Sequence, residues 1–149
     1  METLYDDPFI EIKIGILDDS IEIIGKNEID NIDVFKEVLV EIEQEVADYN
    51  FKNIVFVLDK IKYFPDENLI KNGFLPDISR LGVKKLAVVV GKDKKFETFY
   101  REFINSLKLI EGNLDIKIVI YSDIDSARKW IRNKPYIQTG KLLNFMLIN

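Results

Sequence analysis

The chain has 149 residues and a formal net charge of −5 at pH 7, from 26 acidic and 21 basic residues whose signs are interspersed along the sequence. It contains neither cysteine nor histidine, which excludes disulfides, thiolate nucleophiles and the metal sites and catalytic triads that need these residue types. This length fits one domain with its own hydrophobic core, and we expect no cofactor and no metal.

Neither a membrane span nor a nucleic-acid surface is evident in the sequence. The apolar runs are far shorter than the roughly 20 residues that cross a bilayer. The acidic first residues lack the basic and apolar regions of a secretory signal. Basic residues are not gathered into the face that duplex nucleic acid requires. We therefore expect a cytoplasmic protein that binds no nucleic acid and does not span a membrane.

The first third of the chain predicts an antiparallel hairpin followed by a helix. Apolar and polar residues alternate over residues 10–16 and again around Glu22, with a polar turn between them. From Asp30 the apolar spacing changes to three and four, which is typical of a helix with one apolar face. Asp30 or Asn31 can cap its first turn. The expected apolar stripe is Ile32, Phe35, Leu39, Ile42, Val46 and Tyr49.

The middle of the chain contains two continuous runs of β-branched and aliphatic residues, Ile54–Leu58 and Leu86–Val90. Such runs predict central strands that are covered on both faces. Between them, Glu67–Leu81 has approximate helical spacing, which Gly73 and Pro76 are expected to break into two pieces.

The last third continues the alternation of helix and strand. Aromatic and aliphatic residues at helical spacing predict a helix over 96–107, and alternating isoleucines predict a strand over 116–120. Ser122 or Asp123 caps a last short helix that ends near Ile131. We therefore expect an α/β fold with a mixed sheet of about five strands, an antiparallel pair at one edge and right-handed crossovers.

The expected domain covers residues 1–135, and residues 136–149 form an apolar tail. Because the final βα unit is complete before the tail begins, we expect no vacant face for it within the domain. Large exposed apolar patches usually mark interfaces, so the tail predicts a homodimer. The alternative, that the tail folds back on its own domain, stays open. The apolar residues of the tail are Leu142, Leu143, Phe145, Met146, Leu147 and Ile148.

One set of residues follows the predicted elements in a distinctive order: 57–59 (VLD), 84–90 (KKLAVVV), Phe96, Phe99, Phe103 and 120–131 (IYSDIDSARKWI). In these residues and in its order of elements, the chain resembles the SpoIIAA-like, or STAS, superfamily. The resemblance implies a SpoIIAA-like sandwich and a regulatory, protein-binding module that is not an enzyme. Related anti-sigma-factor antagonists carry a phosphorylatable Ser or Thr just after the corresponding strand. Because Asp59–Leu69 contains neither residue type, we expect no phosphorylation switch here.

Polar residues at the ends of the predicted parallel strands form a candidate surface for a ligand or partner, since open α/β sheets bind ligands at that edge. Asp66 can either cap the next helix or mimic a phosphorylated residue. Gly91–Lys95 has too few glycines for a phosphate-binding loop, and a solvated turn is the simpler interpretation. The candidates are Asp59, Lys60, Tyr63, Asp66, Lys92 and Asp123.

The aromatic residues of the last third allow a second interpretation. They supply either ordinary core packing, with Trp130 closing one end of the core, or the lining of a pocket for a small apolar ligand such as a lipid. The candidate pocket residues are Phe96, Phe99, Tyr100, Phe103 and Trp130. Two hypotheses follow: a non-enzymatic regulatory or protein-interaction module, which we prefer, and a protein that binds a small apolar ligand.

Overall fold

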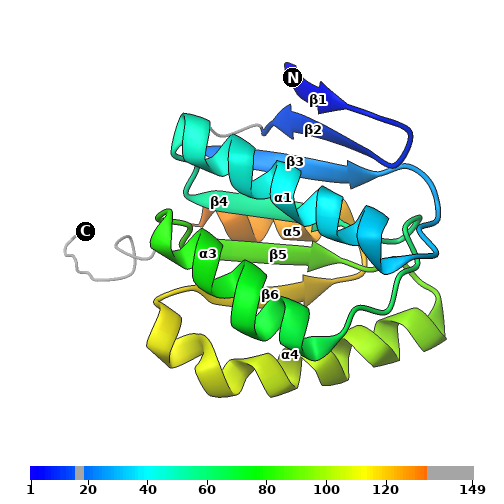
Figure 1. Ribbon diagram of the computed structural model, residues 1–149. Coiled ribbons are helices and arrows are strands. Elements are labelled where there is room, and N and C mark those ends of the chain that lie inside the picture. Colours follow the sequence, from blue (N-terminus) through cyan, green and yellow to red (C-terminus); the bar gives the residue numbers. More distant parts are fainter. Residues whose placement is uncertain (16–18, 134–149) are drawn as a thin grey trace.

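The computed structural model describes residues 1–15 and 19–133, and within the long helix α4 it describes the side chains of all residues except 108–113. Over these residues the chain forms a mixed sheet of six strands in the order β1-β2-β3-β4-β5-β6 (Figure 1). The strands are β1 (Thr3–Asp6), β2 (Ile10–Ile14), β3 (Ser20–Gly25), β4 (Asn53–Val57), β5 (Lys85–Val89) and β6 (Lys117–Tyr121).

Strands β1, β2 and β3 pair in antiparallel fashion, and β3 to β6 pair in parallel. The predicted hairpin is therefore confirmed as β2 and β3, although its connecting residues 16–18 lie outside the described residues. The expectation of about five strands was wrong because it missed β1. That strand has only four residues, and a register shift between Thr3 and Tyr5 interrupts its pairing with β2, so it shows no alternating pattern.

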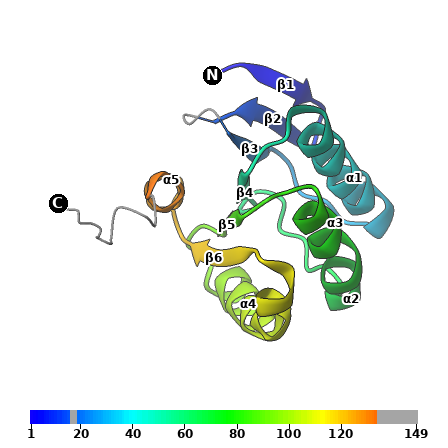
Figure 2. The same cartoon turned by 90° about the vertical axis from the view of Figure 1, so that its left-hand side faces the viewer.

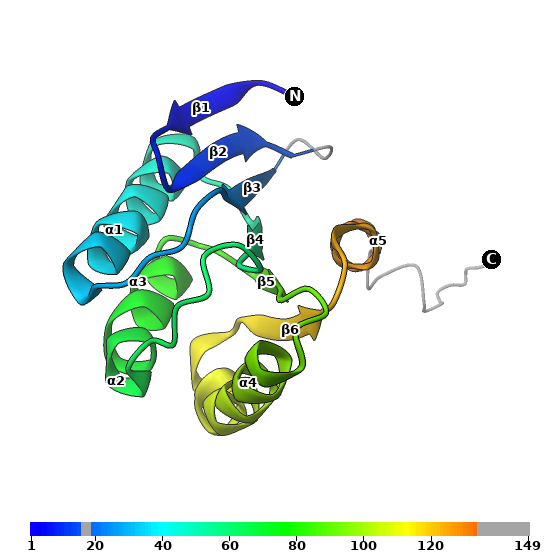
Figure 3. The ribbon, with the colours of Figure 1, turned by 90° about the vertical axis from the view of Figure 1, so that its right-hand side faces the viewer.

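The helices lie in two layers on the sheet (Figures 2 and 3). Three successive crossovers between neighbouring parallel strands place their helices on one face, because such crossovers keep one hand. Helix α5, the last one within the described residues, follows β6 and packs on the opposite face. The helical elements are α1 (Ile32–Tyr49), α2 (Glu67–Leu69), the π-turn η1 (Ile70–Phe74), α3 (Leu75–Arg80), α4 (Lys94–Leu114) and α5 (Ile124–Arg132).

Helix α1 begins where the sequence predicts, because the Asn31 side chain accepts a hydrogen bond from the backbone N–H of Val34 at 2.9 Å. The expected apolar stripe was wrong at both ends: Ile32 is 41% exposed and Tyr49 is 55% exposed. The helix has 18 residues and is therefore about 27 Å long. A strand of five residues, such as β4, spans only about 17 Å. The helix ends therefore extend past the sheet that buries its centre.

The predicted helical segment Glu67–Leu81 was expected to break at Gly73 and Pro76. In the structure, α2, η1 and α3 follow one another without a gap. The backbone N–H of Leu75 donates to the carbonyl of Ile70, which is one residue farther back than in an α-helix. This wider turn lets Pro76 stand in the first turn of α3, where its missing N–H costs no hydrogen bond. The π-turn therefore accommodates the proline without a break.

The main hydrophobic core lies between the sheet and helices α1, α3 and α4. Val88, in one of the two runs predicted to be covered on both faces, is 6% exposed, and Phe103, on the predicted aromatic helix, is 9% exposed. A second, smaller cluster lies between the sheet and α5. Its buried members are Val55, Val57, Ala87, Val89, Ala127 and Ile131. The predicted homodimer through residues 136–149 concerns a segment outside the described residues.

Candidate functional site

The loop between β4 and α2 is fixed to the body of the protein at Ile61. The Ile61 side chain is fully buried, and a Cβ placed on Gly25 would lie 2.6 Å from its Cγ1 atom. Its N–H donates to the carbonyl of Leu58, and its own carbonyl accepts from the N–H of Ile29, both at 3.0 Å. Glycine at position 25 therefore makes room for the loop beside β3, and the loop has a defined position.

Two more residues anchor the same loop on the helical side of the sheet. The Tyr63 ring stacks on Phe35 with a centroid separation of 4.5 Å, and the Tyr63 carbonyl accepts a hydrogen bond from the Tyr100 hydroxyl at 3.0 Å. Burial, and to a lesser degree the nearby Tyr63, raises the pKa of the Tyr100 hydroxyl, which therefore stays protonated. Pro65 is also buried. The residue between these two anchors, Phe64, is thus held in place on both sides along the chain.

That residue, Phe64, points outward and is 52% exposed. Its ring makes edge-to-face contacts with Phe99 and Phe96, with centroids 4.8 Å and 5.5 Å apart. A large aromatic ring is therefore presented to solvent while two rings of α4 support it. We did not predict this residue as part of the site. The available signal was an aromatic residue before a proline in a loop, outside every periodic apolar stripe.

The carboxyl ends of β4, β5 and β6 bring several of the predicted site residues to one edge. Gly91 follows β5 with a φ of 75°, and a Cβ there would lie 2.8 Å from the Cβ of Asp59. Asp59 is therefore in close contact with the turn that carries Lys92. The positive charge of Lys92 also acts on Asp123, where it adds to the effect of the hydrogen bonds from Ser126 and helps to lower the pKa of the Asp123 carboxyl.

Three carboxylates at this edge serve as helix caps. Asp66 accepts from the N–H of Asn68 at 2.7 Å, Asp93 accepts from that of Phe96 at 3.1 Å, and Asp123 accepts from that of Ser126 at 2.8 Å. Each bond satisfies a backbone N–H at the start of a helix that would otherwise lack a partner. Helix capping therefore accounts for the position of Asp66 without any phosphorylated state.

The lysines of this edge are exposed. They are Lys60, Lys62, Lys92, Lys94 and Lys95. Within residues 1–15 and 19–133, none of them forms an ion pair. Elsewhere, Lys26 pairs with Asp6, Lys84 with Asp115, and Arg101 with Glu97. We use the name carboxyl-edge surface for one set of residues at this edge. The set consists of Asp59, Phe64, Lys60, Lys62, Lys92, Lys94 and Lys95.

The predicted aromatic pocket is only partly assembled. Tyr100 and Phe103 line a cavity of about 50 Å³ beneath α4 that has an entirely apolar wall. Phe96 and Phe99 contact the Tyr100 ring but do not line this cavity, and their rings also pack on Phe64. Trp130 was wrongly grouped with them, because it lies on the opposite face of the sheet and packs against the small cluster under α5. Trp130 belongs to α5, which packs on the face that the other described helices leave open.

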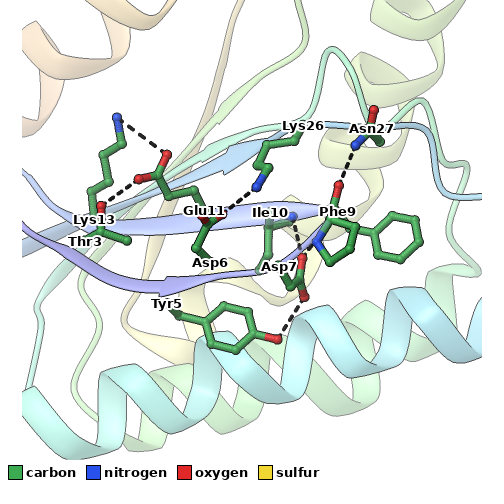
Figure 4. A network of polar contacts seen from close by, with 11 residues as sticks. Thr3, Tyr5, Asp6, Asp7, Phe9, Ile10, Glu11, Lys13, Lys26 and Asn27 are labelled. Carbon is green, nitrogen blue, oxygen red and sulfur yellow. Dashed lines mark hydrogen bonds and ion pairs between the residues drawn. The ribbon is translucent and has the colours of Figure 1, made fainter.

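A separate polar network fixes the turn between β1 and β2 (Figure 4). Asp7 accepts hydrogen bonds from the backbone N–H groups of Phe9 and Ile10, at 2.7 and 2.8 Å, and from the Tyr5 hydroxyl at 2.8 Å. Burial disfavours the charged Asp7 carboxylate, but these bonds outweigh burial and lower its pKa. The same bond from Tyr5, together with burial, raises the pKa of Tyr5 to about 12. This network closes a turn at the sheet edge.

Among the described residues, no group of three or more acidic side chains is placed to hold a metal ion. No helix in the same ranges combines the length and apolarity that crossing a bilayer demands. Comparison with protein-family models, with curated proteins and with solved structures found no match to this chain. The resemblance to the SpoIIAA-like superfamily therefore stays a prediction.

Proposed function

We propose that this chain is a non-enzymatic regulatory or protein-interaction module of the SpoIIAA-like, or STAS, type, and that it binds a protein partner through the carboxyl-edge surface. The observation that carries the proposal is Phe64, a half-exposed aromatic ring on an anchored loop. Protein interfaces draw much of their binding energy from a few such aromatic residues, which a polar and charged rim surrounds.

The contacts that Phe64 already makes strengthen this proposal. Binding costs conformational entropy when side chains must be fixed, and a side chain that neighbouring rings already restrain avoids part of that cost. Phe64 is held by Tyr63 and Pro65 along the chain and by two ring contacts from α4. A ring of this kind is ready to pack against an apolar group of a partner, while the surrounding lysines keep the free surface hydrated.

The regulatory mechanism of phosphorylated relatives is not part of the proposal. Related antagonists use a hydroxyl in the turn after the corresponding strand, whereas Asp59–Leu69 here has Tyr63 as its only hydroxyl side chain. The Tyr63 ring stacks on Phe35 and lies half-buried in the anchored loop. Binding through this edge would therefore be controlled by the presence of the partner and not by modification of the turn.

The alternative function, binding of a small apolar ligand, has weaker support. The cavity beneath α4 is apolar, as such a site requires, but its volume is about 50 Å³. Sites for drug-sized ligands enclose about 300–1,000 Å³. A lipid chain would therefore need α4 to move away from the sheet. Native mass spectrometry of protein purified from its own cells tests this alternative, since a retained ligand adds mass to the chain.

Site-specific photo-crosslinking in cells tests the preferred function. A photoreactive phenylalanine analogue replaces Phe64 in one version of the protein and Tyr49 in the control version. Tyr49 is a suitable control because it is an aromatic residue that is 55% exposed at the far end of α1. We expect a discrete protein adduct from position 64 and none of the same mass from position 49. Identical adducts from both positions, or none from position 64, would contradict the proposal.

A further inference from the structure

The sheet of the described residues ends in two edge strands, β1 and β6, which differ in how well they are protected (Figure 1). We infer that β6 pairs with β6 of a second copy of this chain, in antiparallel orientation about Ile120, and that this pairing forms a homodimer. The inference stands independently of the proposed function, because the pairing does not involve Phe64.

Strand β1 has the features by which natural proteins prevent pairing at a sheet edge. It has only four residues, and a register shift between Thr3 and Tyr5 makes its backbone irregular. It also carries a charged side chain, Asp6, which forms an ion pair with Lys26. Short length, irregularity and charge all discourage the addition of another strand. The edge at β1 is therefore protected.

Strand β6 lacks most of this protection. It has five residues, and all five keep a regular parallel register with β5. Residues 118–120 are β-branched and Tyr121 is aromatic, types that favour strands, whereas the single charged residue, Lys117, comes first. Val119, Ile120 and Tyr121 are half-buried. No strand of the described chain lies beyond β6, and a regular apolar edge of this kind readily accepts another strand.

The hydrogen bonds between β5 and β6 show which backbone groups of β6 face outward. The N–H of Lys117 donates to the carbonyl of Lys84 at 2.9 Å, and the carbonyl of Tyr121 accepts from the N–H of Val90 at 3.0 Å. Successive residues of a strand direct their backbone groups to opposite sides, so the N–H and carbonyl of Ile120 point away from β5. In an antiparallel pair centred on Ile120, the two copies of this residue exchange both hydrogen bonds.

The side chains of β6 are complementary to themselves in this arrangement. Ile120 lies opposite its own counterpart, and Val119 lies opposite Tyr121 of the second copy. A two-fold axis repeats each contact, as in most homodimers. Pairs of β-branched residues with each other or with aromatic residues are among those that stabilise neighbouring strands. The pairing therefore covers the three apolar side chains that β6 leaves half-buried.

Lys117 and Asp123 add charge complementarity. Both are exposed, and neither forms an ion pair within residues 1–15 and 19–133. The carboxylate of Asp115, beside Lys117 in the chain, is already paired with Lys84 at 2.7 Å. Asp123 caps α5 and lies within the influence of Lys92. Antiparallel pairing brings Lys117 of each copy opposite Asp123 of the other, whereas parallel pairing in register would align like charges.

A groove beside β6 gives room for the second strand. It has a volume of about 250 Å³ and lies between α4 and β6. Its lining consists of Arg101, Ile104 and Asn105 from α4 and residues 118–120 of β6. Residues that lie directly opposite each other in an antiparallel pair point to the same face of the sheet. Ile120 of the second copy can therefore enter this groove beside its counterpart.

Sedimentation velocity and light scattering of the full chain test the proposed dimer. We expect the unmodified chain to dimerise. Lys117→Glu should raise the dissociation constant of the dimer by about tenfold, because it places two carboxylates opposite each other at both ends of the paired strands. Lys36→Glu is the control, since Lys36 is exposed on α1 and its replacement changes the total charge by the same amount.

Introduced cysteines test the register, because the chain has none of its own. Ile120→Cys should form a disulfide-linked dimer under mild oxidation, since directly opposite residues that exchange hydrogen bonds have Cα atoms about 5.5 Å apart, within reach of a disulfide. Thr98→Cys is the control. Thr98 is exposed on α4, and we expect no rapid cross-linking from this position.

Three results would overturn the inference. The first is a full chain that stays monomeric at the highest concentration at which it is soluble. The second is a dimer in which Ile120→Cys cross-links no faster than Thr98→Cys, because association then uses another surface, such as residues 136–149. The third is a dissociation constant that Lys117→Glu leaves unchanged. Lys117 is exposed, so its variant tests the pairing even if Ile120→Cys lowers stability. None of these results affects the proposed function, which depends on adducts from position 64.

Discussion

The two faces of the sheet are covered in different ways. One face lies under α1, α3 and α4 and is sealed by a large and almost wholly apolar core. The other face is covered, among the described residues, by the nine-residue helix α5. This short helix buries few apolar side chains, Ala127 and Ile131 among them. Figures 2 and 3 show this asymmetry: of the described helices, α5 lies on one side of the sheet and the others lie on the opposite side.

Polar contacts from the sheet compensate for the small apolar area of α5. Arg128 makes two hydrogen bonds of 2.7 Å to the carboxylate of Glu22, a residue of β3 that is only 2% exposed. Lys85, at the start of β5, donates to the carbonyls of Trp130 and Asn133 at the end of the helix and lies over the Trp130 ring. Isolated helices of this length are marginal in water, so these contacts fix where α5 forms.

The largest predicted effect concerns the apolar face. Phe103→Ala should lower the free energy of unfolding by about 3–5 kcal/mol, because the residue is 9% exposed and its loss enlarges the cavity beneath α4. Denaturant titration measures the change. Val40→Ala is the control, since Val40 is 59% exposed and should change stability by about 0.5 kcal/mol at most. A loss below about 1 kcal/mol for Phe103→Ala would contradict the assigned core.

The second prediction concerns the opposite face. Arg128→Met should lower the free energy of unfolding by about 3 kcal/mol, because it leaves the buried carboxylate of Glu22 without a partner. The double variant Glu22→Leu/Arg128→Met should recover most of that loss, since an apolar pair has no charge to desolvate. Lys129→Met, an exposed neighbour on the same helix, is the control. If both Arg128 and Lys129 variants keep full stability, polar contacts do not hold α5.

The third prediction compares the helix caps of the two faces. Asn31→Ala should cost about 1 kcal/mol and increase hydrogen exchange only in the first turn of α1, since packing holds the rest of that helix. Asp123→Ala should increase exchange along the whole of α5, because the helix is short and a frayed first turn weakens its docking. Mass spectrometry of peptides from both helices distinguishes the two patterns. Increases in exchange that are equal in the two variants and confined to the first turn of each helix would contradict this prediction.

The smallest predicted effect is a dependence of stability on pH at the contact between α1 and α3. Burial, together with the charge of Asp77 and a hydrogen bond to it, raises the pKa of Glu43 from 4.5 to about 7, whereas Arg80 opposes this shift. The folded state therefore holds a proton that the unfolded state releases above pH 4.5. Stability from this group is complete below pH 4.5 and is lost as pH rises through about 7.

Replacement of Glu43 tests that contribution. Glu43→Gln keeps a hydrogen-bond donor toward Asp77 but removes the titrating group. The fall in unfolding free energy between pH 5 and pH 8 should therefore become smaller. The difference should be less than about 1 kcal/mol, because solvent screens the pair. The fall should not vanish, since the pKa of Glu45 is also raised to about 7, by burial and by Glu41 and Asp48. Glu102→Gln, exposed on α4, is the control. If the fall in unfolding free energy with pH is unchanged in Glu43→Gln, the folded state does not hold an extra proton at Glu43.

The candidate site was predictable in part. The polar residues at the ends of the parallel strands follow from chain order, because parallel strands end at one edge of the sheet. The caps Asp66 and Asp123 follow from their position before helical spacing begins. Phe64 could not be assigned, because an aromatic residue in a loop shows no periodicity that distinguishes a buried ring from an exposed one. Trp130 was misplaced because local sequence does not reveal which face of a sheet a terminal helix covers.

The sequence by itself determined the class of fold, the order of helices and strands after β1, and the strands that are buried on both faces. These properties depend on periodicity and capping within short segments, where neighbouring residues decide the outcome. Tertiary structure alone decided the face chosen by α5, the partner of Glu22 and the exposure of Phe64. Glu22 and Arg128 are 106 residues apart in the chain, and contacts of this kind exist only once distant elements pack on the same sheet.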